Sequence, residues 1–234
     1  MSILDKEGNE LLPPKIAVAI PSHDMCPMLF AYDLGQMMMY STAVLPDNVE
    51  IGVTVVTGTY IHQARQQLLA HMLEAGVTHA LWLDSDMRFP KETLIHLLKR
   101  GEDIVGANYS QRGFPPDFVA IKRNGWTTLE DKGEKCVTND DSTGLEEVDA
   151  IGFGCVMTRL EPLEKLPMDE PWFWYELVLD NRHVGEDAYF CRLVKERLGM
   201  KIFVDHDLSK EVAHIGQFEF NTSHVQAVKA EEEK

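Results

Sequence analysis

The sequence has few cysteines, and their spacing matches no disulfide or metal-binding motif. Cys26, Cys136, Cys155 and Cys191 are scattered, without a CxxC pair or a zinc-finger spacing. This pattern is typical of free thiols in a reducing compartment rather than of a disulfide framework. Long apolar runs are also absent, since the longest are far too short to span a bilayer, and no stretch resembles a signal peptide. We therefore predict a cytoplasmic protein, made by a cell or by something that replicates inside one.

Basic residues are scarce as well. The chain has 22 Lys and Arg against 38 Asp and Glu, a formal charge of −16. This excess argues against broad electrostatic binding of nucleic acid or of an anionic membrane, although it leaves room for a local basic groove. Hydrophobic residues make up 44% of 234 residues, so the chain can bury a sizeable core. We expect a loose polar leader at 1–14, one domain at 15–216 and a polar tail at 217–234.

The stretch Ala80–Met87 is the centre of the predicted site. Its apolar part has the length of a strand buried on both faces, and it ends in Asp84-Ser85-Asp86. Alternate residues of an extended chain point the same way, so the two carboxylates can face one pocket. Carboxylates at the carboxyl end of a buried strand suit a hard divalent cation that carries phosphates. The other interpretations are two solvated loop carboxylates, or Asp86 as the cap of the next helix.

The first half of the chain alternates strands and helices. Strands are expected at 15–20, 49–56, 79–83 and 103–107, and helices at 29–45, 61–75 and 91–100. This order predicts an α/β fold with a mostly parallel central sheet and crossover helices. Ligands in such sheets bind beyond the carboxyl ends of the strands, where the Pro21–Asp24 loop, the Gly58 turn and Asp84–Asp86 all lie. Arg65 falls inside the apolar stripe of the second helix, so it either pairs with a core carboxylate or faces an anionic ligand.

The second half is less regular. Residues 125–143 are charged and rich in turn formers, which predicts a small β-hairpin excursion. Two strand pieces, 147–151 and 155–159, flank Gly152-Phe153-Gly154, where glycines allow either a bulge or a close approach to a ligand. The aromatic run Trp172–Tyr175 can be core or can stack on sugars. Glu186 and Asp187 open a helix that runs to Leu198, and they are either partners of the helix dipole or catalytic groups.

Taken in order, these motifs resemble those of the GT-A fold glycosyltransferases, in particular glycosyltransferase family 2 and its short bacterial and phage relatives. The likeness covers about residues 15–216. The motifs that carry it are the opening strand with Pro21-Ser22, Ala64-Arg65, Leu83-Asp84-Ser85-Asp86 as the Asp-x-Asp motif, Val148–Gly154, Glu186-Asp187 and finally His214. The resemblance implies a Rossmann-like GT-A sheet and sugar transfer from a nucleoside-diphosphate sugar to an acceptor hydroxyl.

The resemblance also implies a role for each matching residue. The nucleotide sugar would contact residues of several loops: Pro21, Ser22, His23, Arg65, Asp84, Ser85 and Gly154. Mn²⁺ or Mg²⁺ would be held by Asp86 and His214, with Asp84 on the ribose or the metal. Asp187 would be the general base of an inverting reaction, with Glu186 beside it. For the acceptor we expect contacts from Tyr109, Arg112 and Trp172.

The sequence departs from the family's pattern at one place, and it leaves several alternative functions open. Family members often carry an acidic pair after the second strand, but this chain has Val56-Thr57-Gly58-Thr59, which leaves the nucleotide base open. A nucleotidyltransferase would need a glycine-rich loop with a lysine after the first strand, and Pro21–Asp24 lacks one. A carbohydrate-binding module would leave the acidic motifs unexplained, and a retaining transferase stays open. The acceptor can be a saccharide, a protein or a hydroxymethylated DNA base, as in some phage enzymes, with Arg112, Lys122 and Arg123 as a local basic groove.

Overall fold

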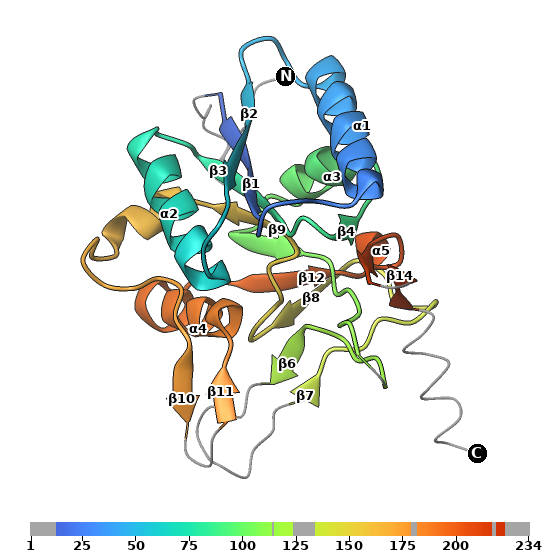
Figure 1. Ribbon diagram of the computed structural model, residues 1–234, viewed down its shortest axis with the longest axis vertical. Helices are drawn as coiled ribbons and strands as arrows, with labels where there is room; N and C mark the ends of the chain where they lie inside the picture. Colours follow the sequence, from blue (N-terminus) through green and yellow to red (C-terminus); the bar gives the residue numbers. More distant parts are fainter. Residues whose placement is uncertain (1–12, 114, 124–133, 179–181, 217–218, 223–234) are drawn as a thin grey trace.

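The computed structural model describes residues 13–113, 115–123, 134–178, 182–216 and 219–222. Most of the expected leader and tail lies outside these ranges, and the division into domains stays a prediction. A seven-stranded sheet forms the centre of the molecule (Figure 1). Its strands, in spatial order, are β2 (Glu50–Val56), β1 (Lys15–Pro21), β3 (His79–Leu83), β9 (Cys155–Arg159), β5 (Ile104–Gly106), β12 (Ile202–Asp205) and β8 (Leu145–Val148). All but β9 and β8 run in the same direction, so the predicted mostly parallel sheet is confirmed.

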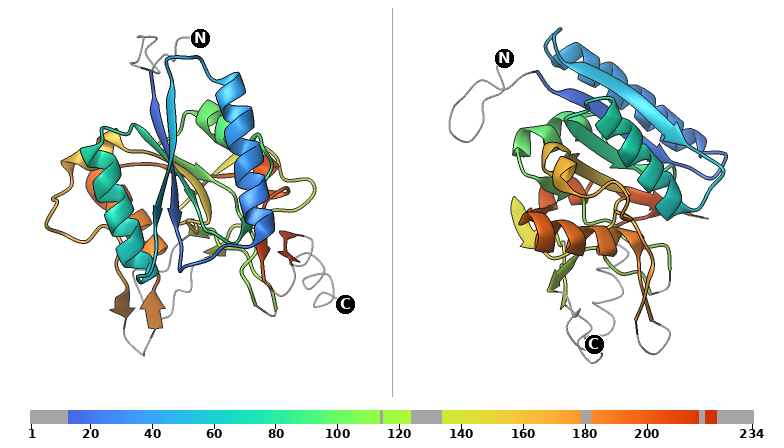
Figure 2. Two further views of the ribbon diagram at one scale, coloured as in Figure 1. Left: turned by 45° about the horizontal axis from the view of Figure 1, so that its top comes forward. Right: turned by 90° about the vertical axis from the view of Figure 1, so that its left-hand side faces the viewer.

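Helices cover both faces of this sheet. Helices α1 (Met28–Val44) and α3 (Thr93–Arg100) lie on one face, and α2 (Ile61–Glu74) and α4 (Glu186–Leu198) on the other (Figures 1 and 2). The alternation along β1 explains the two cores, because successive side chains of a strand point to opposite faces. Ile16, Val18 and Ile20 pack on the α1 and α3 side, whereas Ala17 and Ala19 pack on the α2 and α4 side.

Strand β9 comes late in the chain but lies in the middle of the sheet. It is inserted between β3 and β5 and is antiparallel to both. Gly106 makes this close packing possible. A Cβ atom at Gly106 would lie 2.6 Å from the carbonyl oxygen of Cys155, so any side chain there would push β9 away.

Short strand pairs lie outside the main sheet. Hairpin strands β10 (Glu176–Val178) and β11 (Arg182–Val184) project from the α4 side (Figure 2), and β6 (Ile121–Arg123) pairs with β7 (Glu134–Lys135). The latter pair confirms an antiparallel excursion, although its residues 124–133 lie outside the described ranges. A third sheet joins β4 (Met87–Arg88), β13 (Ala213–Ile215) and β14 (Glu219–Phe220). A 3₁₀ helix, Glu161–Lys165, and the short helix α5, His206–Ser209, complete the described elements.

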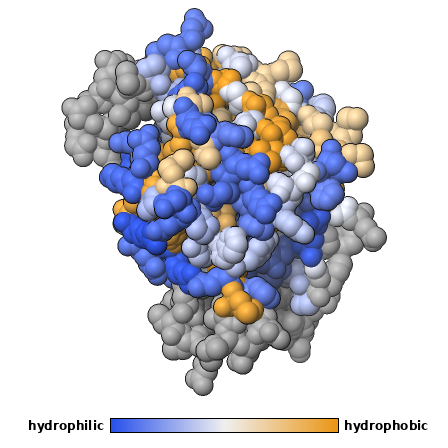
Figure 3. Space-filling model, turned by 60° about the vertical axis from the view of Figure 1, so that its left-hand side comes forward, coloured by the Kyte–Doolittle hydropathy of each residue, from blue (hydrophilic) through white to orange (hydrophobic). Residues whose placement is uncertain are grey.

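The face that carries α2 and α4 is mostly hydrophilic, with hydrophobic residues mainly in the upper half of the view (Figure 3). Within the described ranges, no helix combines the length and the hydrophobicity that crossing a bilayer requires. The cytoplasmic location stays a prediction.

Candidate active site

Asp84 and Asp86 emerge from the end of β3 but turn to different partners. The backbone N–H of Asp84 donates to the carbonyl of Gly154 at 3.1 Å, and that of Met87 donates to the carbonyl of Asp84 at 3.2 Å. This tight turn fixes both carboxylates at the carboxyl edge of the sheet, where each side chain is 24% exposed. Both carboxylates are therefore partly open to solvent, and their role in binding a ligand stays a prediction.

Arg65 bridges two acidic motifs, one 19 and the other 121 residues further along the chain. Its guanidinium donates to Asp84 Oδ1 and to Glu186 Oε1, both at 2.8 Å. The side chain is only 3% exposed and lies over the ring of Phe153. Burial alone would lower the pKa of Arg65, but Asp84, Glu186 and Asp187 raise it above its ordinary value. Of the two interpretations left open by the sequence, pairing with core carboxylates is the observed one, so Arg65 positions the site and does not present its charge to a nucleotide.

Asp187 lies beside this bridge in the first turn of α4. Burial, together with the neighbouring charge of Glu186, raises the pKa of Asp187 to about 6, whereas Arg65 acts in the opposite direction. Its Oδ1 accepts a hydrogen bond from the N–H of Ala188 at 2.7 Å, which holds the carboxylate at the start of the helix. A carboxylate with this pKa is ionised near neutral pH and remains basic enough to accept a proton.

His214 reaches Asp86 because β13 pairs with β4. The N–H of Ile215 donates to the carbonyl of Asp86 at 2.7 Å, and His214 Nε2 then lies 3.3 Å from Asp86 Oδ1. Arg112 contacts the other oxygen of Asp86 at 2.9 Å. Burial alone would raise the pKa of Asp86, but His214 and Arg112 lower it below its usual range. The acidic motif and the late histidine of the sequence are thus brought together.

The Gly152–Gly154 segment is packed against Tyr109. The N–H of Gly154 donates to the Tyr109 hydroxyl at 2.9 Å, and a Cβ at Gly154 would lie 2.6 Å from that oxygen. A Cβ at Gly152 would lie 2.7 Å from the same atom. The glycines therefore let Tyr109 pack against the segment that binds the Asp84 turn. Tyr109 itself is only 4% exposed. This burial corrects the expectation that Tyr109 contacts an acceptor.

The loop after β1 lies next to the Asp84–Asp86 turn. The hydroxyl of Ser22 donates to that of Ser85 at 3.3 Å, and the N–H of Gly58 donates to the carbonyl of His23 at 2.7 Å. Pro21 is buried at the end of β1, whereas the side chain of His23 is 89% exposed. The predicted nucleotide loop therefore borders the predicted metal residues.

The aromatic run divides between core and surface. Trp172 and Phe173 are each 1% exposed, and their N–H groups both donate to Gln66 Oε1, which ties the run to α2. Trp172 therefore has no ring face for an acceptor, and the expectation for this residue is corrected. Trp174 and Tyr175 are 50% and 43% exposed.

An exposed ring cluster, formed by Tyr60, His62, Trp174 and Tyr175, was not foreseen. The ring of His62 lies 5.7 Å from Trp174, 5.3 Å from Tyr175 and 6.0 Å from Tyr60, measured between centroids. Tyr175 also shares a hydrogen bond with Glu186, and burial followed by the charge of Glu186 raises the pKa of Tyr175. The sequence indicated aromatic stacking here, but not which of the rings face solvent.

Three residues at the sheet edge could hold a divalent cation, which stays a prediction. Asp86 and His214 present an oxygen and a nitrogen in contact with each other, and Asp84 is held nearby by the bridge to Arg65. Arg112, half-exposed, already supplies positive charge to Asp86, so a cation can take its place there.

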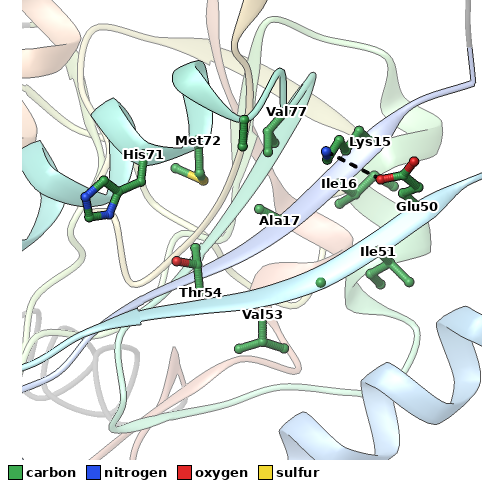
Figure 4. Close-up of a pocket in the computed structure, with 12 residues that line it drawn as sticks. Lys15, Ile16, Ala17, Glu50, Ile51, Val53, Thr54, His71, Met72 and Val77 are labelled. Carbon is green, nitrogen blue, oxygen red and sulfur yellow. Dashed lines mark ion pairs between the residues drawn. The ribbon is translucent and has the colours of Figure 1, made fainter.

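A pocket of about 230 Å³ lies at the start of β1, at the end of the strand that is remote from Asp84 and Asp86 (Figure 4). It is lined by Lys15, Ile51, His71 and Met72 among others. It contains none of the three residues at the sheet edge.

The fold and the site define a mixed α/β protein of the Rossmann-like class with a cluster of carboxylates at the carboxyl edge of its sheet. No protein-family model matches the sequence, and no curated protein matches it. Among solved structures, 78 chains are similar. One is the crystal structure of A197 from STIV, with a TM-score of 0.54, 18% identity and coverage of 86% of this chain and 86% of that chain. At this identity the likeness is one of fold alone.

Proposed function

We propose that this protein is a metal-dependent glycosyltransferase of the GT-A fold, which moves a sugar from a nucleoside diphosphate to an acceptor hydroxyl with inversion. One observation carries the proposal: motifs from four distant parts of the chain meet at one edge of the sheet. Asp84 and Glu186 share Arg65, and Asp86 contacts His214. Sugar transfer also accounts for the carboxylate of Asp187 beside this group.

Each group has a place in the proposed reaction. A divalent cation, Mn²⁺ or Mg²⁺, would be held by Asp86, His214 and Asp84, and it would offset the charge that builds on the leaving diphosphate. Asp187 would accept the proton of the acceptor hydroxyl as the new glycosidic bond forms. Arg65 would keep Glu186 and Asp84 in place, and Ser22 with Ser85 would border the nucleotide. Arg112, released from Asp86, would be free to contact the diphosphate.

The metal role can be tested by binding. Asp86→Asn should weaken the Mn²⁺-dependent affinity for a nucleoside diphosphate by roughly 10-fold or more, because a neutral amide is a poor ligand and the pairing with His214 changes. Isothermal titration calorimetry with and without a chelator measures the change. Asp103→Asn is the matched control, because Asp103 pairs with Arg159 at the start of β5, away from the site. Equal affinity in Asp86→Asn and Asp103→Asn would contradict the assignment.

The exposed ring cluster supports a saccharide as the acceptor. Its rings lie next to Glu186 through Tyr175, and aromatic faces pack against the apolar faces of sugar rings. Trp174→Ala should therefore lower the rate of transfer to a sugar acceptor by roughly 10-fold, while hydrolysis of the donor by water stays unchanged. Met168→Ala, which also truncates an exposed apolar side chain, serves as control. A parallel loss of donor hydrolysis in Trp174→Ala would place the cluster on the donor side instead.

A further inference from the structure

Cys136, Glu146 and His206 form a compact group outside the proposed active site. Cys136 follows β7, Glu146 lies in β8, and His206 begins α5, so three separate segments contribute. Glu146 Oε2 lies 3.0 Å from His206 Nε2 and 3.8 Å from Cys136 Sγ. One ligand atom from each residue falls within 4.8 Å of the others. These spacings match the distances between neighbouring ligand atoms around a tetrahedral ion bound at about 2.0–2.3 Å.

The surrounding structure fixes each of these side chains. His206 Nδ1 contacts the hydroxyl of Thr138 at 2.9 Å, which directs Nε2 toward Glu146. The backbone of Cys136 is held on both sides: its N–H donates to Ala120, and its carbonyl accepts from the buried Asn108. Partners of this kind orient metal ligands before the ion arrives.

The chemical types of the three groups indicate which ion would bind. A thiolate, an imidazole and a carboxylate form a mixed soft and hard set, which suits Zn²⁺ better than Mg²⁺ or Ca²⁺. The negative charges of the thiolate and the carboxylate would together match the charge of the dication. Lys122 pairs with Oε1 of Glu146 at 2.7 Å and leaves Oε2 directed into the group.

Access and location distinguish this site from the carboxylates of the proposed reaction. Cys136 and His206 are buried, at 0% and 4% exposure, but the Glu146 side chain is 30% exposed and opens one side to solvent. Glu146 lies on β8, the edge strand at one end of the sheet, whereas Asp84 and Asp86 follow β3. A sequence scan would not find the group, since its members are 10 and 60 residues apart.

We propose that Cys136, Glu146 and His206 bind Zn²⁺ with three protein ligands and one solvent position. Binding replaces the thiol proton of Cys136, released to solvent, with a zinc–sulfur bond. The ion would link the segment after β7 to β8 and α5. Because the three ligands come together only in the folded chain, Zn²⁺ would stabilise the native state. The proposal is independent of the proposed sugar transfer.

Spectroscopy on the full chain tests this site. After removal of metals by chelation, Co²⁺ is titrated as a spectroscopic substitute for Zn²⁺. We expect one equivalent to produce a thiolate-to-cobalt charge-transfer absorption, which Zn²⁺ then removes. Cys136→Ser should lose this absorption and weaken Zn²⁺ binding by roughly 100-fold or more. Cys26→Ser is the matched control, because Cys26 is exposed and outside the group, and it should keep the absorption.

Two further variants keep the result decisive. Glu146→Gln alters a partly exposed ligand and should fold even where the buried Cys136→Ser does not, and it should weaken Zn²⁺ binding at least about 10-fold. Asp86→Asn removes the other candidate metal position and should leave the cobalt absorption intact. Zn²⁺ should also raise the melting temperature of the wild type more than that of Glu146→Gln. No cobalt–thiolate absorption in the wild type, or its loss in Cys26→Ser, would show a hydrogen-bonded group without a metal and overturn the proposal.

Discussion

Replacing Asp187 with asparagine should lower the turnover of sugar transfer by roughly 10²-fold or more. The amide keeps the shape of the side chain but cannot accept the proton of the acceptor hydroxyl. Its contact with the N–H of Ala188 can be kept through the remaining oxygen. Mn²⁺-dependent affinity for a nucleoside diphosphate should stay nearly unchanged, because Asp187 is not among the proposed ligands. Steady-state rates and calorimetric titration of the same protein sample separate the two quantities.

The pH dependence of this reaction gives an independent readout. Because the pKa of Asp187 is raised to about 6, the wild-type rate should rise as the pH passes upward through that value and the carboxylate ionises. A cation bound at Asp86 would move this limb to lower pH. In Asp187→Asn the limb should disappear.

The melting temperature of Asp187→Asn shows whether a loss of turnover comes from unfolding of the variant. Because the pKa of Asp187 is raised in the folded state, its ionised form lowers the stability of the fold above about pH 6, so Asp187→Asn should not lower the melting temperature at pH 7. Glu186→Gln should reduce turnover less, since Glu186 acts through Arg65. Wild-type turnover in Asp187→Asn would show that Asp187 is only a partner of the helix dipole, and the inverting mechanism would lose its base.

Periodicity located the regular elements well. Strand β3 has the predicted bounds, and the predicted helix after Ile61 is α2. Apolar runs and amphipathic stripes are local signals, and here the packed core agrees with them. The insertion of β9 between β3 and β5 could not be predicted from these local signals, because the choice of partner strand depends on long-range contacts such as the fit of β9 against Gly106.

The sequence singled out residues of the candidate site but not the contacts between them. Asp84, Asp86, Asp187 and His214 were singled out, whereas the pairing of β13 with β4, which joins His214 to Asp86, involves strands too short to show a period. The aromatic run shows the same limit. Trp172 and Trp174 lie two residues apart, yet only the tertiary structure shows that the first is enclosed and the second exposed.

The bridge made by Arg65 should dominate the stability of the site. Arg65→Met preserves much of the side-chain length and removes the charge, which leaves the mostly buried Asp84 and Glu186 without the cation that pairs them. Removing one member of a buried ion pair typically costs about 3–5 kcal/mol. Urea denaturation at pH 7 measures the free energy of unfolding. Arg159→Met is the control, because Arg159 pairs with Asp103 while 44% exposed, and its loss should cost about 0–1 kcal/mol.

A second substitution shows whether the cost comes from unpaired charge. In the wild type, Glu186→Gln removes one end of the bridge to Arg65 and should destabilise the fold. In the Arg65→Met background the same change removes a buried carboxylate that has lost its cation, so it should stabilise the fold. The effect of Glu186→Gln should therefore change sign between the two backgrounds. Equal effects in both would mean that Arg65 stabilises the site through packing over Phe153 and not through its charge.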